Sequence, residues 1–194
     1  MPNAGFLSAS KFEQLMKPSD LKKGVFGDGC MTLAYEIALA RLGVELPEAY
    51  GAALNWGNEH EWSAIESYKE LKMCDVVRPE FIPHPELSYV GGTPDGFVGT
   101  LGIIEVKCPY NPIYHARNRA NAEQYHEQYK AQCQGYLWIT DREWVDFVSF
   151  DPRYPEGLRL SVHRFERDQD YIDVLSERVK NFLPIIENTL NQIK

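Results

Sequence analysis

Apolar residues repeat at helical spacing in the first third of the chain. The spacing predicts a helix over residues 28–41 that ends before Gly43. It also predicts a longer helix over residues 47–72, and a short helix after the polar stretch Ser8-Ala9-Ser10 that ends near residue 17. The residues that share a face are Met31, Tyr35, Ala38 and Leu39 in the first helix, and Leu54, Glu61, Ile65 and Tyr68 in the longer one.

The middle of the chain changes to short β-rich segments separated by Gly and Pro, a pattern that predicts strands. A helix is predicted over residues 122–139, and a final helix that begins at Asp168 or Asp170 runs to about residue 193. The predicted strands cover residues 76–82, 89–90, 96–98, 103–108, 144–150 and 158–165.

The order of these elements indicates an α/β fold. Helices come first, then a cluster of strands, a helix, two strands and a last helix. This order suggests a central mixed sheet with helices on both sides. The 194 residues, of which 44% are hydrophobic, are enough for a single domain over residues 1–194 with a sizeable core.

Composition narrows the setting of the protein. No run approaches the ~20 apolar residues of a membrane span, and the N-terminus lacks the pattern of a secretion signal. The four cysteines lie far apart in the sequence, so we expect reduced thiols, a cytoplasmic location and no zinc site. The net charge of -8 is the main objection to a nucleic-acid partner. Bound divalent ions would soften it, as would an oligomer that gathers Arg117, Arg119 and Lys130 around a shared channel.

The richest candidate chemistry lies between residues 95 and 107. Asp95 sits in a Pro-Asp-Gly turn, and if the strands on either side of this turn pair, Asp95 is carried close to Glu105. In the strand 103–108 side chains alternate, so Glu105 and Lys107 share one face. Two carboxylates and a backbone carbonyl, for which Val106 is the candidate, form an oxygen site that suits Mg²⁺ or Mn²⁺. Lys107 could orient an attacking water, help to deprotonate it, or offset developing negative charge.

Two further polar residues lie on otherwise apolar or aromatic helical faces. Glu61 on such a face should be paired, neutralised or bound to metal. Gln132 lies among Tyr125, Tyr129 and Tyr136, and its amide must find hydrogen-bond partners, for which a scissile phosphate or the attacking water is a candidate.

Structural explanations compete with each of these assignments. Asp95 alone is a common turn residue, and Glu105 with Lys107 could be an ion pair on a solvated strand. Glu61 could lie at an exposed edge of its helix, and the tyrosines are more often core than a base-stacking platform. The specificity of the signal lies in the combination of these residues.

The combination resembles a known nuclease family. Pro94-Asp95, a spacer and Glu105-Val106-Lys107 match the PD-(D/E)xK signature of restriction-endonuclease-like nucleases. The surrounding sequence resembles the branch of phage lambda exonuclease, the YqaJ-type viral recombinases. The segments that carry the likeness are the helix Gly57-Asn58-Glu59-His60-Glu61-Trp62-Ser63-Ala64, Cys108-Pro109 after the lysine, Tyr129-Lys130-Ala131-Gln132-Cys133-Gln134, and the turn Phe150-Asp151-Pro152-Arg153.

The resemblance implies a restriction-endonuclease-like core and roles for the matched residues. Asp95, Glu105 and the Val106 carbonyl would bind one or two Mg²⁺ ions, with Glu61 assisting. Lys107 would act on the attacking water, and Gln132 would help to position it. Ser10, with the neighbouring Ser8, would lie near a terminal 5′-phosphate.

The resemblance also implies an activity and partners. The enzyme would degrade one strand of double-stranded DNA from an end in the 5′-to-3′ direction, to mononucleotides and a 3′ single-stranded tail. It would work as a ring-shaped homotrimer with a single-strand annealing protein, encoded by a phage or prophage in a bacterial cell.

One departure concerns the phosphate anchor. Relatives carry an arginine before the serine stretch, and the best-aligned position in this chain is Asn3. Either Arg117 or Arg119 replaces the missing anchor, or the preference for a 5′-phosphate is weaker.

Four alternatives compete with this interpretation. An endonuclease or junction-cleaving enzyme of the same superfamily would use the same residues on a different substrate. A non-catalytic DNA-binding module could retain the fold. A small-molecule metallohydrolase has no positive feature in the sequence, and an iron–sulfur nuclease would need clustered cysteines.

Overall fold

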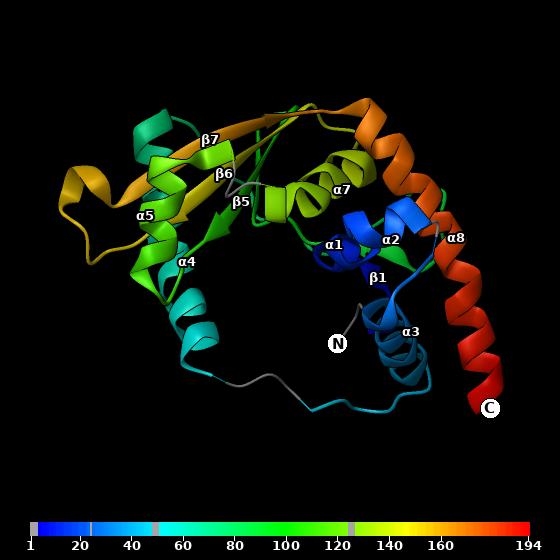
Figure 1. Ribbon diagram of the computed structural model, residues 1–194. Coiled ribbons are helices and arrows are strands. Elements are labelled where there is room, and N and C mark those ends of the chain that lie inside the picture. Colours follow the sequence, from blue (N-terminus) through cyan, green and yellow to red (C-terminus); the bar gives the residue numbers. More distant parts are fainter. Residues whose placement is uncertain (1–3, 24, 48–50, 124–126) are drawn as a thin grey trace.

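The computed structural model describes residues 4–23, 25–47, 51–123 and 127–194 (Figure 1). Its main sheet has four strands in the order β4-β5-β6-β7, and β5 and β6 run parallel while the outer pairs are antiparallel. The strands are β4 (Gly96–Val98), β5 (Gly102–Lys107), β6 (Trp144–Phe150) and β7 (Leu160–Glu166). The predicted α/β class and mixed sheet are confirmed.

A second, smaller sheet has the order β1-β3-β2. Its strands are β1 (Leu7–Ser8), β2 (Ile82–Pro83) and β3 (Val90–Gly92), and β1 lies parallel to β3. The predicted strand over residues 76–82 is wrong in extent, because most of that segment forms only an isolated bridge from Val77 to Phe97 before β2 begins.

The helices agree with the prediction best where glycine or a polar cap marks an end. The helix α3 has the predicted bounds, and α8 begins after Asp168, whose side chain accepts a hydrogen bond from the Tyr171 amide. The helical elements are η1 (Ala9–Lys11), α1 (Phe12–Leu15), α2 (Pro18–Lys23), α3 (Asp28–Arg41), α4 (Ala52–Lys72), α5 (Pro112–Ala120), η2 (Glu127–Tyr129), α7 (Lys130–Thr140), η3 (Glu156–Leu158) and α8 (Gln169–Ile193).

Two helix predictions differ from the structure. The longer N-terminal helix begins at Ala52, five residues after the predicted start, and residues 48–50 lie outside the described part. The predicted helix over residues 122–139 is not continuous: residues 122–123 are helical, residues 124–126 are not described, and η2 and α7 follow. The helix α5 was not predicted, because its sequence is polar and its buried side chains are His115 and Asn118.

The two faces of the main sheet are covered by different helices. On one face Ile103 and Phe147 pack in a core formed with α1, α3, α7 and α8. On the other face Ile104 and Val148 pack against Ile65 and its neighbours on α4. This alternation along β5 sends successive side chains to opposite helical layers, as the period of a strand requires.

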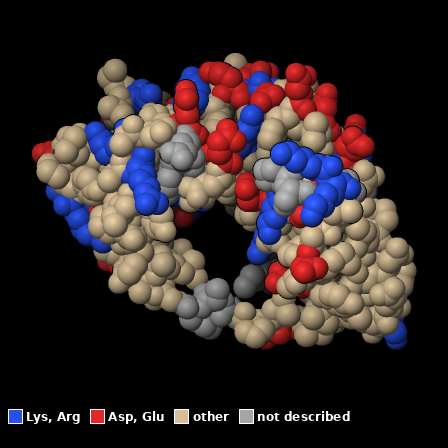
Figure 2. Space-filling model, viewed as in Figure 1, with Lys and Arg blue, Asp and Glu red and all other residues tan. Residues whose placement is uncertain are grey.

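The molecule is hollowed between its two sides. Figure 2 shows an opening between the part built on α4 and α5 and the part built on α1, α2 and α3. Over the described ranges, no helix is both long and apolar enough to cross a membrane.

Candidate active site

The antiparallel pairing of β4 with β5 places Asp95 beside Glu105. Gly96 pairs with Ile104, and the preceding Asp95 accepts a 2.6 Å hydrogen bond through Oδ2 from the Val106 amide. The predicted approach is correct in outcome but wrong in cause. The strand before Asp95, β3, belongs to the other sheet, so the strands on either side of the turn do not pair.

Glu105 is the centre of the polar contacts in this region. Its carboxylate is 1% exposed. Through Oε1 it pairs with the Lys107 ammonium group and accepts a 2.7 Å hydrogen bond from Gln132 Nε2. Its second oxygen, Oε2, is buried and accepts no hydrogen bond from any residue that the structure describes. A buried carboxylate oxygen without a donor is costly, so this atom is a candidate for binding a cation.

The two carboxylates perturb each other. Burial and the charge of Glu105 raise the pKa of Asp95 well above its usual value. Burial also raises the pKa of Glu105, although Lys107 and Gln132 oppose the shift. Burial alone would lower the pKa of Lys107, but the adjacent Glu105 carboxylate outweighs burial and raises it. Two desolvated acids side by side are typical of a site that holds a divalent cation.

Glu61 influences the two acids electrostatically, but its carboxylate is paired with a residue outside the site. Its carboxylate forms an ion pair with Arg78, a residue that no sequence motif marks. The negative charge of Glu61 nevertheless raises the pKa of both Asp95 and Glu105, so the three acids lie within electrostatic range. Its predicted role at a metal ion stays a prediction.

Gln132 is fixed by a partner that the sequence analysis treated as core. Its Nε2 also donates a 3.0 Å hydrogen bond to the Tyr136 hydroxyl, one helical turn further along α7. Tyr136 is buried, and its hydroxyl donates to the Thr93 carbonyl at 3.2 Å. This chain of contacts links α7 to the segment that leads into Asp95. Tyr136 follows Gln132 by four residues on a helix, and this spacing in the sequence could have identified it as a partner of Gln132.

The donor set fits a hard divalent cation. In the described part of the chain, no three His, Cys, Asp or Glu side chains converge as a complete metal cage. Mg²⁺ does not require such a cage, because it is usually held by one or two carboxylates and retains several waters. Asp95, Glu105 with its unpartnered Oε2, and the Val106 carbonyl are therefore the residues that could hold it.

The remaining predicted residues lie apart from these acids or make other contacts. Ser10 donates a 3.2 Å hydrogen bond to Ser8, just before α1. Arg119 is bound to the Leu160 carbonyl at 2.8 Å, and Arg117 lies 5.9 Å from the centre of the Tyr114 ring. Lys130 pairs with Asp168 at the start of α8. Asn3 and Tyr125 lie outside the described residues.

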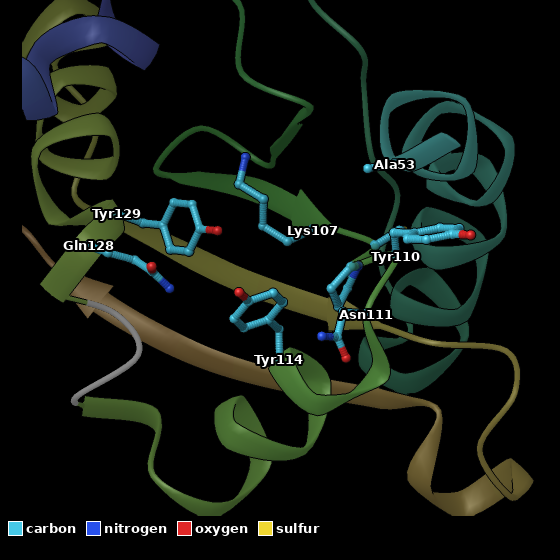
Figure 3. A pocket seen from close by; sticks show the side chains of 9 residues that line it. Ala53, Lys107, Tyr110, Asn111, Tyr114, Gln128 and Tyr129 are labelled. Carbon is cyan, nitrogen blue, oxygen red and sulfur yellow. The ribbon is translucent and has the colours of Figure 1, made fainter. Parts of the chain in front are cut away.

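A cavity of about 490 Å³ opens next to Lys107 (Figure 3). Its lining comes from four places: the end of β5 and the segment after it, α5, the start of α4, and the residues before α7. Figure 3 shows Tyr114, from α5, projecting into this space between Asn111 and Tyr129. The cavity lies in the size range of small-molecule sites.

Solved structures of exonucleases share this fold. The alkaline exonuclease LHK-Exo from Laribacter hongkongensis superposes with a TM-score of 0.86 at 27% identity, over 99% of this chain and 93% of that chain. The structure of LHK-Exo in complex with dAMP gives 0.88 at 29% identity, over 100% and 93%. A phage-related exonuclease from Haemophilus somnus 129PT shares the fold, with a TM-score of 0.79 at 21% identity over 97% and 96%.

The family follows from the sequence. The model of the YqaJ-like viral recombinase domain matches residues 3–143, which is most of the chain, and the protein belongs to this family. The resemblance inferred from the sequence is therefore confirmed. No curated protein matches the chain.

Proposed function

We propose that this protein is a Mg²⁺-dependent exonuclease that degrades one strand of linear double-stranded DNA in the 5′-to-3′ direction. The observation that carries the proposal is the half-buried Asp95 beside the buried Glu105, with one Glu105 oxygen unpartnered among the described residues and Lys107 alongside. Membership of the viral recombinase family and the likeness to LHK-Exo, an alkaline exonuclease, support it.

The residues have separate tasks in this proposal. Asp95, Glu105 and the Val106 carbonyl hold Mg²⁺, with Glu61 assisting from its helix. The ion supplies Lewis-acid activation of water and of the phosphate. Lys107 orients the attacking water and offsets the charge that develops on the phosphate, and Gln132 fixes the orientation of Glu105. The protein contributes position and charge, because attack on phosphorus needs little covalent chemistry.

The surface supports a DNA substrate despite the net charge. Figure 2 shows Lys and Arg side chains on both sides of the opening, over α2 and over α5. The last turn of α2 carries Lys22 and Lys23, and that of α5 carries Arg117 and Arg119. Phosphate contacts of this kind supply much of the affinity for DNA. The structure of LHK-Exo with dAMP is consistent with mononucleotide products.

The wider setting is part of the same proposal. Residues 1–194 act as one nuclease domain, and three copies form a ring around the duplex. The 3′ single-stranded tail is passed to a single-strand annealing protein during recombination in the bacterial cytoplasm, as the phage-type family suggests. Ser8 and Ser10 contact the terminal 5′-phosphate, with Arg117 as a second candidate.

The first experiment is a time course on linear duplex labelled at one end at a time, with a supercoiled circle as a second substrate. An exonuclease of the proposed polarity releases a 5′ label first, as a mononucleotide, and leaves the circle intact. Nicking of the circle would instead support an endonuclease of the same superfamily.

The second experiment tests the site. Lys107→Ala and Asp95→Ala should abolish degradation in Mg²⁺ while the far-ultraviolet circular dichroism is unchanged. The matched controls, Lys180→Ala and Asp173→Ala, replace exposed residues of α8 and should keep full activity. Undiminished degradation by folded Lys107→Ala or Asp95→Ala protein would contradict the assignment of the site.

A further inference from the structure

The cavity beside Lys107 has more aromatic surface than phosphate chemistry requires. Tyr110, Tyr114 and Tyr129 all line it. Tyr110 and Tyr114 keep 52% and 45% of their surface exposed. A phosphate is bound by cations and N–H groups, whereas exposed aromatic rings favour another planar group.

Tyr129 lies beside Lys107 and is held in place by Phe147. The Tyr129 ring lies 5.2 Å from the Lys107 ammonium group and 4.9 Å from the ring of Phe147, which is fully buried on β6. In Figure 3 Tyr114 projects from the opposite side of the cavity, so the space beside Lys107 is bounded by aromatic rings on two sides. A nucleobase is a planar group that stacks on such rings.

An amide group adds a polar contact beside the rings. Asn111 caps α5 because its Oδ1 accepts a 3.0 Å hydrogen bond from the Ile113 amide. This contact uses the oxygen and leaves the NH₂ group, which lies beside Tyr114, to donate to a ring nitrogen or a base carbonyl (Figure 3). Each of the four bases carries at least one of these two acceptors.

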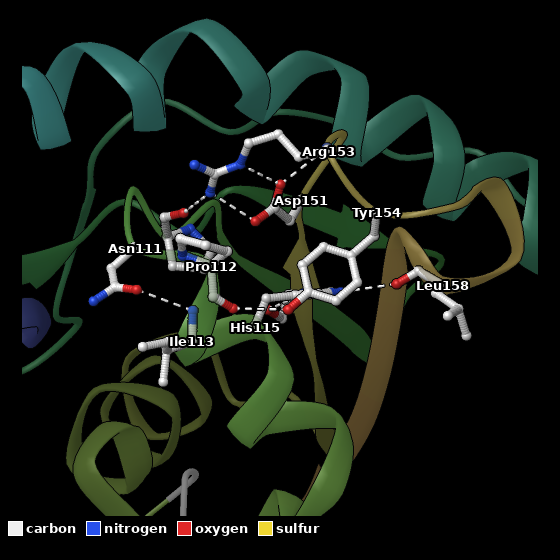
Figure 4. Close-up of polar contacts among 10 residues, drawn as sticks. Asn111, Pro112, Ile113, His115, Asp151, Arg153, Tyr154 and Leu158 are labelled. Atoms are coloured by element: carbon white, nitrogen blue, oxygen red, sulfur yellow. Dashed lines mark hydrogen bonds and ion pairs between the residues drawn. The ribbon is translucent and has the colours of Figure 1, made fainter.

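Residues 109–112, which form one wall of the cavity, are held in place by hydrogen bonds to residues outside it. Arg153 donates a 3.2 Å hydrogen bond to the Pro109 carbonyl and is itself bound to Asp151. The Tyr154 hydroxyl donates a 3.0 Å hydrogen bond to the Pro112 carbonyl (Figure 4). These contacts position the wall before any ligand arrives, and a preorganised wall costs less entropy on binding.

We infer that this cavity is a base-stacking subsite, which takes the unpaired nucleobase of the nucleotide whose phosphate lies at Lys107. The inference rests on the proposed nuclease function and extends it. Stacking on Tyr114 and Tyr129 stabilises the base after it has left its partner in the duplex. Because every base has a flat face, the subsite accepts all four bases with little preference.

The test compares how two small probes bind to the protein of residues 1–194 in the presence of Ca²⁺. The probes are dAMP and 2-deoxyribose 5-phosphate, which lacks the base. Equilibrium binding of each is measured for the wild type, Tyr114→Ala, Tyr114→Phe and the control Tyr35→Ala. Tyr35 is matched to Tyr114, with 47% of its surface exposed, but it lies on α3 and does not line the cavity.

We expect the wild type to bind dAMP about tenfold or more tightly than the sugar phosphate. Tyr114→Ala should weaken dAMP by about tenfold and leave the sugar phosphate unchanged, while Tyr114→Phe and Tyr35→Ala behave as the wild type. Because Tyr114→Phe keeps the ring, it separates stacking from any contact of the hydroxyl.

Two results would overturn the inference without touching the nuclease assignment. In the first, a wild type that degrades linear duplex binds both probes equally tightly. In the second, folded Tyr114→Ala protein binds dAMP as tightly as the wild type does. A wild type that fails to degrade linear duplex in Mg²⁺ would overturn the proposed function and the subsite together.

Discussion

Removing one hydroxyl group from Tyr68 tests how α4 is fixed to the main sheet. Tyr68 is buried on α4, and its hydroxyl donates a 2.7 Å hydrogen bond to Asp146 Oδ2 on β6. Asp146 is 1% exposed and also accepts two hydrogen bonds from Arg164, at 2.7 and 2.9 Å. Tyr68→Phe removes one of three donors to a buried carboxylate and leaves no cavity of consequence.

The magnitude follows from the nature of that bond. A hydrogen bond to a charged group contributes about 1.5–3 kcal/mol to stability. The Arg164 guanidinium group still neutralises Asp146 after the substitution, so the lower end of this range applies. For a protein of 194 residues, a loss of about 1.5 kcal/mol lowers the Tm by roughly 3–6 °C.

Thermal unfolding of the wild type and Tyr68→Phe, followed by circular dichroism at pH 7, measures the shift. The exposed Tyr35→Phe is the control and should change the Tm by less than about 1 °C. A Tm for Tyr68→Phe equal to that of the control would mean that the hydroxyl does not stabilise Asp146, and the account of how α4 docks would be wrong.

Three further outcomes are expected. Ca²⁺ should support DNA binding but little cleavage, because it is larger and more loosely coordinated than Mg²⁺; comparable degradation rates in the two ions would contradict the proposed geometry. Burial lowers the pKa of His115 in the folded protein. As the pH falls, His115 is therefore protonated in the unfolded chain before it is protonated in the folded one. The stability contributed by neutral His115 is present above about pH 6.5 and is lost as the pH falls below it. Urea unfolding at pH 7.5 and 5.5 should therefore show a smaller acid loss for His115→Gln than for the wild type, and equal losses would refute this. In Gly91→Ala the new Cβ would lie 2.5 Å from the Ile82 carbonyl oxygen, which should cost about 1–3 kcal/mol by urea unfolding. In the control Gly57→Ala, on α4, the new Cβ meets no atom of the described residues within 4 Å beyond its own helix backbone and chain neighbours, and the variant should gain up to about 1 kcal/mol.

Sequence patterns predicted the elements whose signals are local. The helix α3 was found because apolar spacing and Gly43 mark its extent, and Gly43 does adopt a positive φ of 77°. The strand β6 was found because β-branched and aromatic residues fill all of its positions except Asp146 and Ser149. The helix α5 was missed because polar groups fix it in place, with the imidazole of His115 bound to Ser149 and to the Leu158 carbonyl. Apolar periodicity carries no trace of such contacts.

The candidate site shows the same division. Strand alternation predicted that Glu105 and Lys107 share a face, and a turn signal drew attention to Asp95. Sequence alone could not show that Glu61 pairs with Arg78, because that contact joins a helix to a loop 17 residues away. The pairing of β1 with β3 was also beyond reach, since it depends on segments more than 80 residues apart.

The position of the N-terminal segment has a consequence for synthesis of the protein. Leu7 pairs with Val90 in β3, and Ala9 packs close to Gly92 and Gly135, which lies on α7. Residues 7–9 leave the ribosome before both of these partners. β1 is therefore available as soon as β3 emerges, but Gln132 and Gly135 of α7 are synthesised only after both acids. A nascent chain therefore cannot place Gln132 against Glu105 until α7 has been synthesised, and the site is incomplete until then.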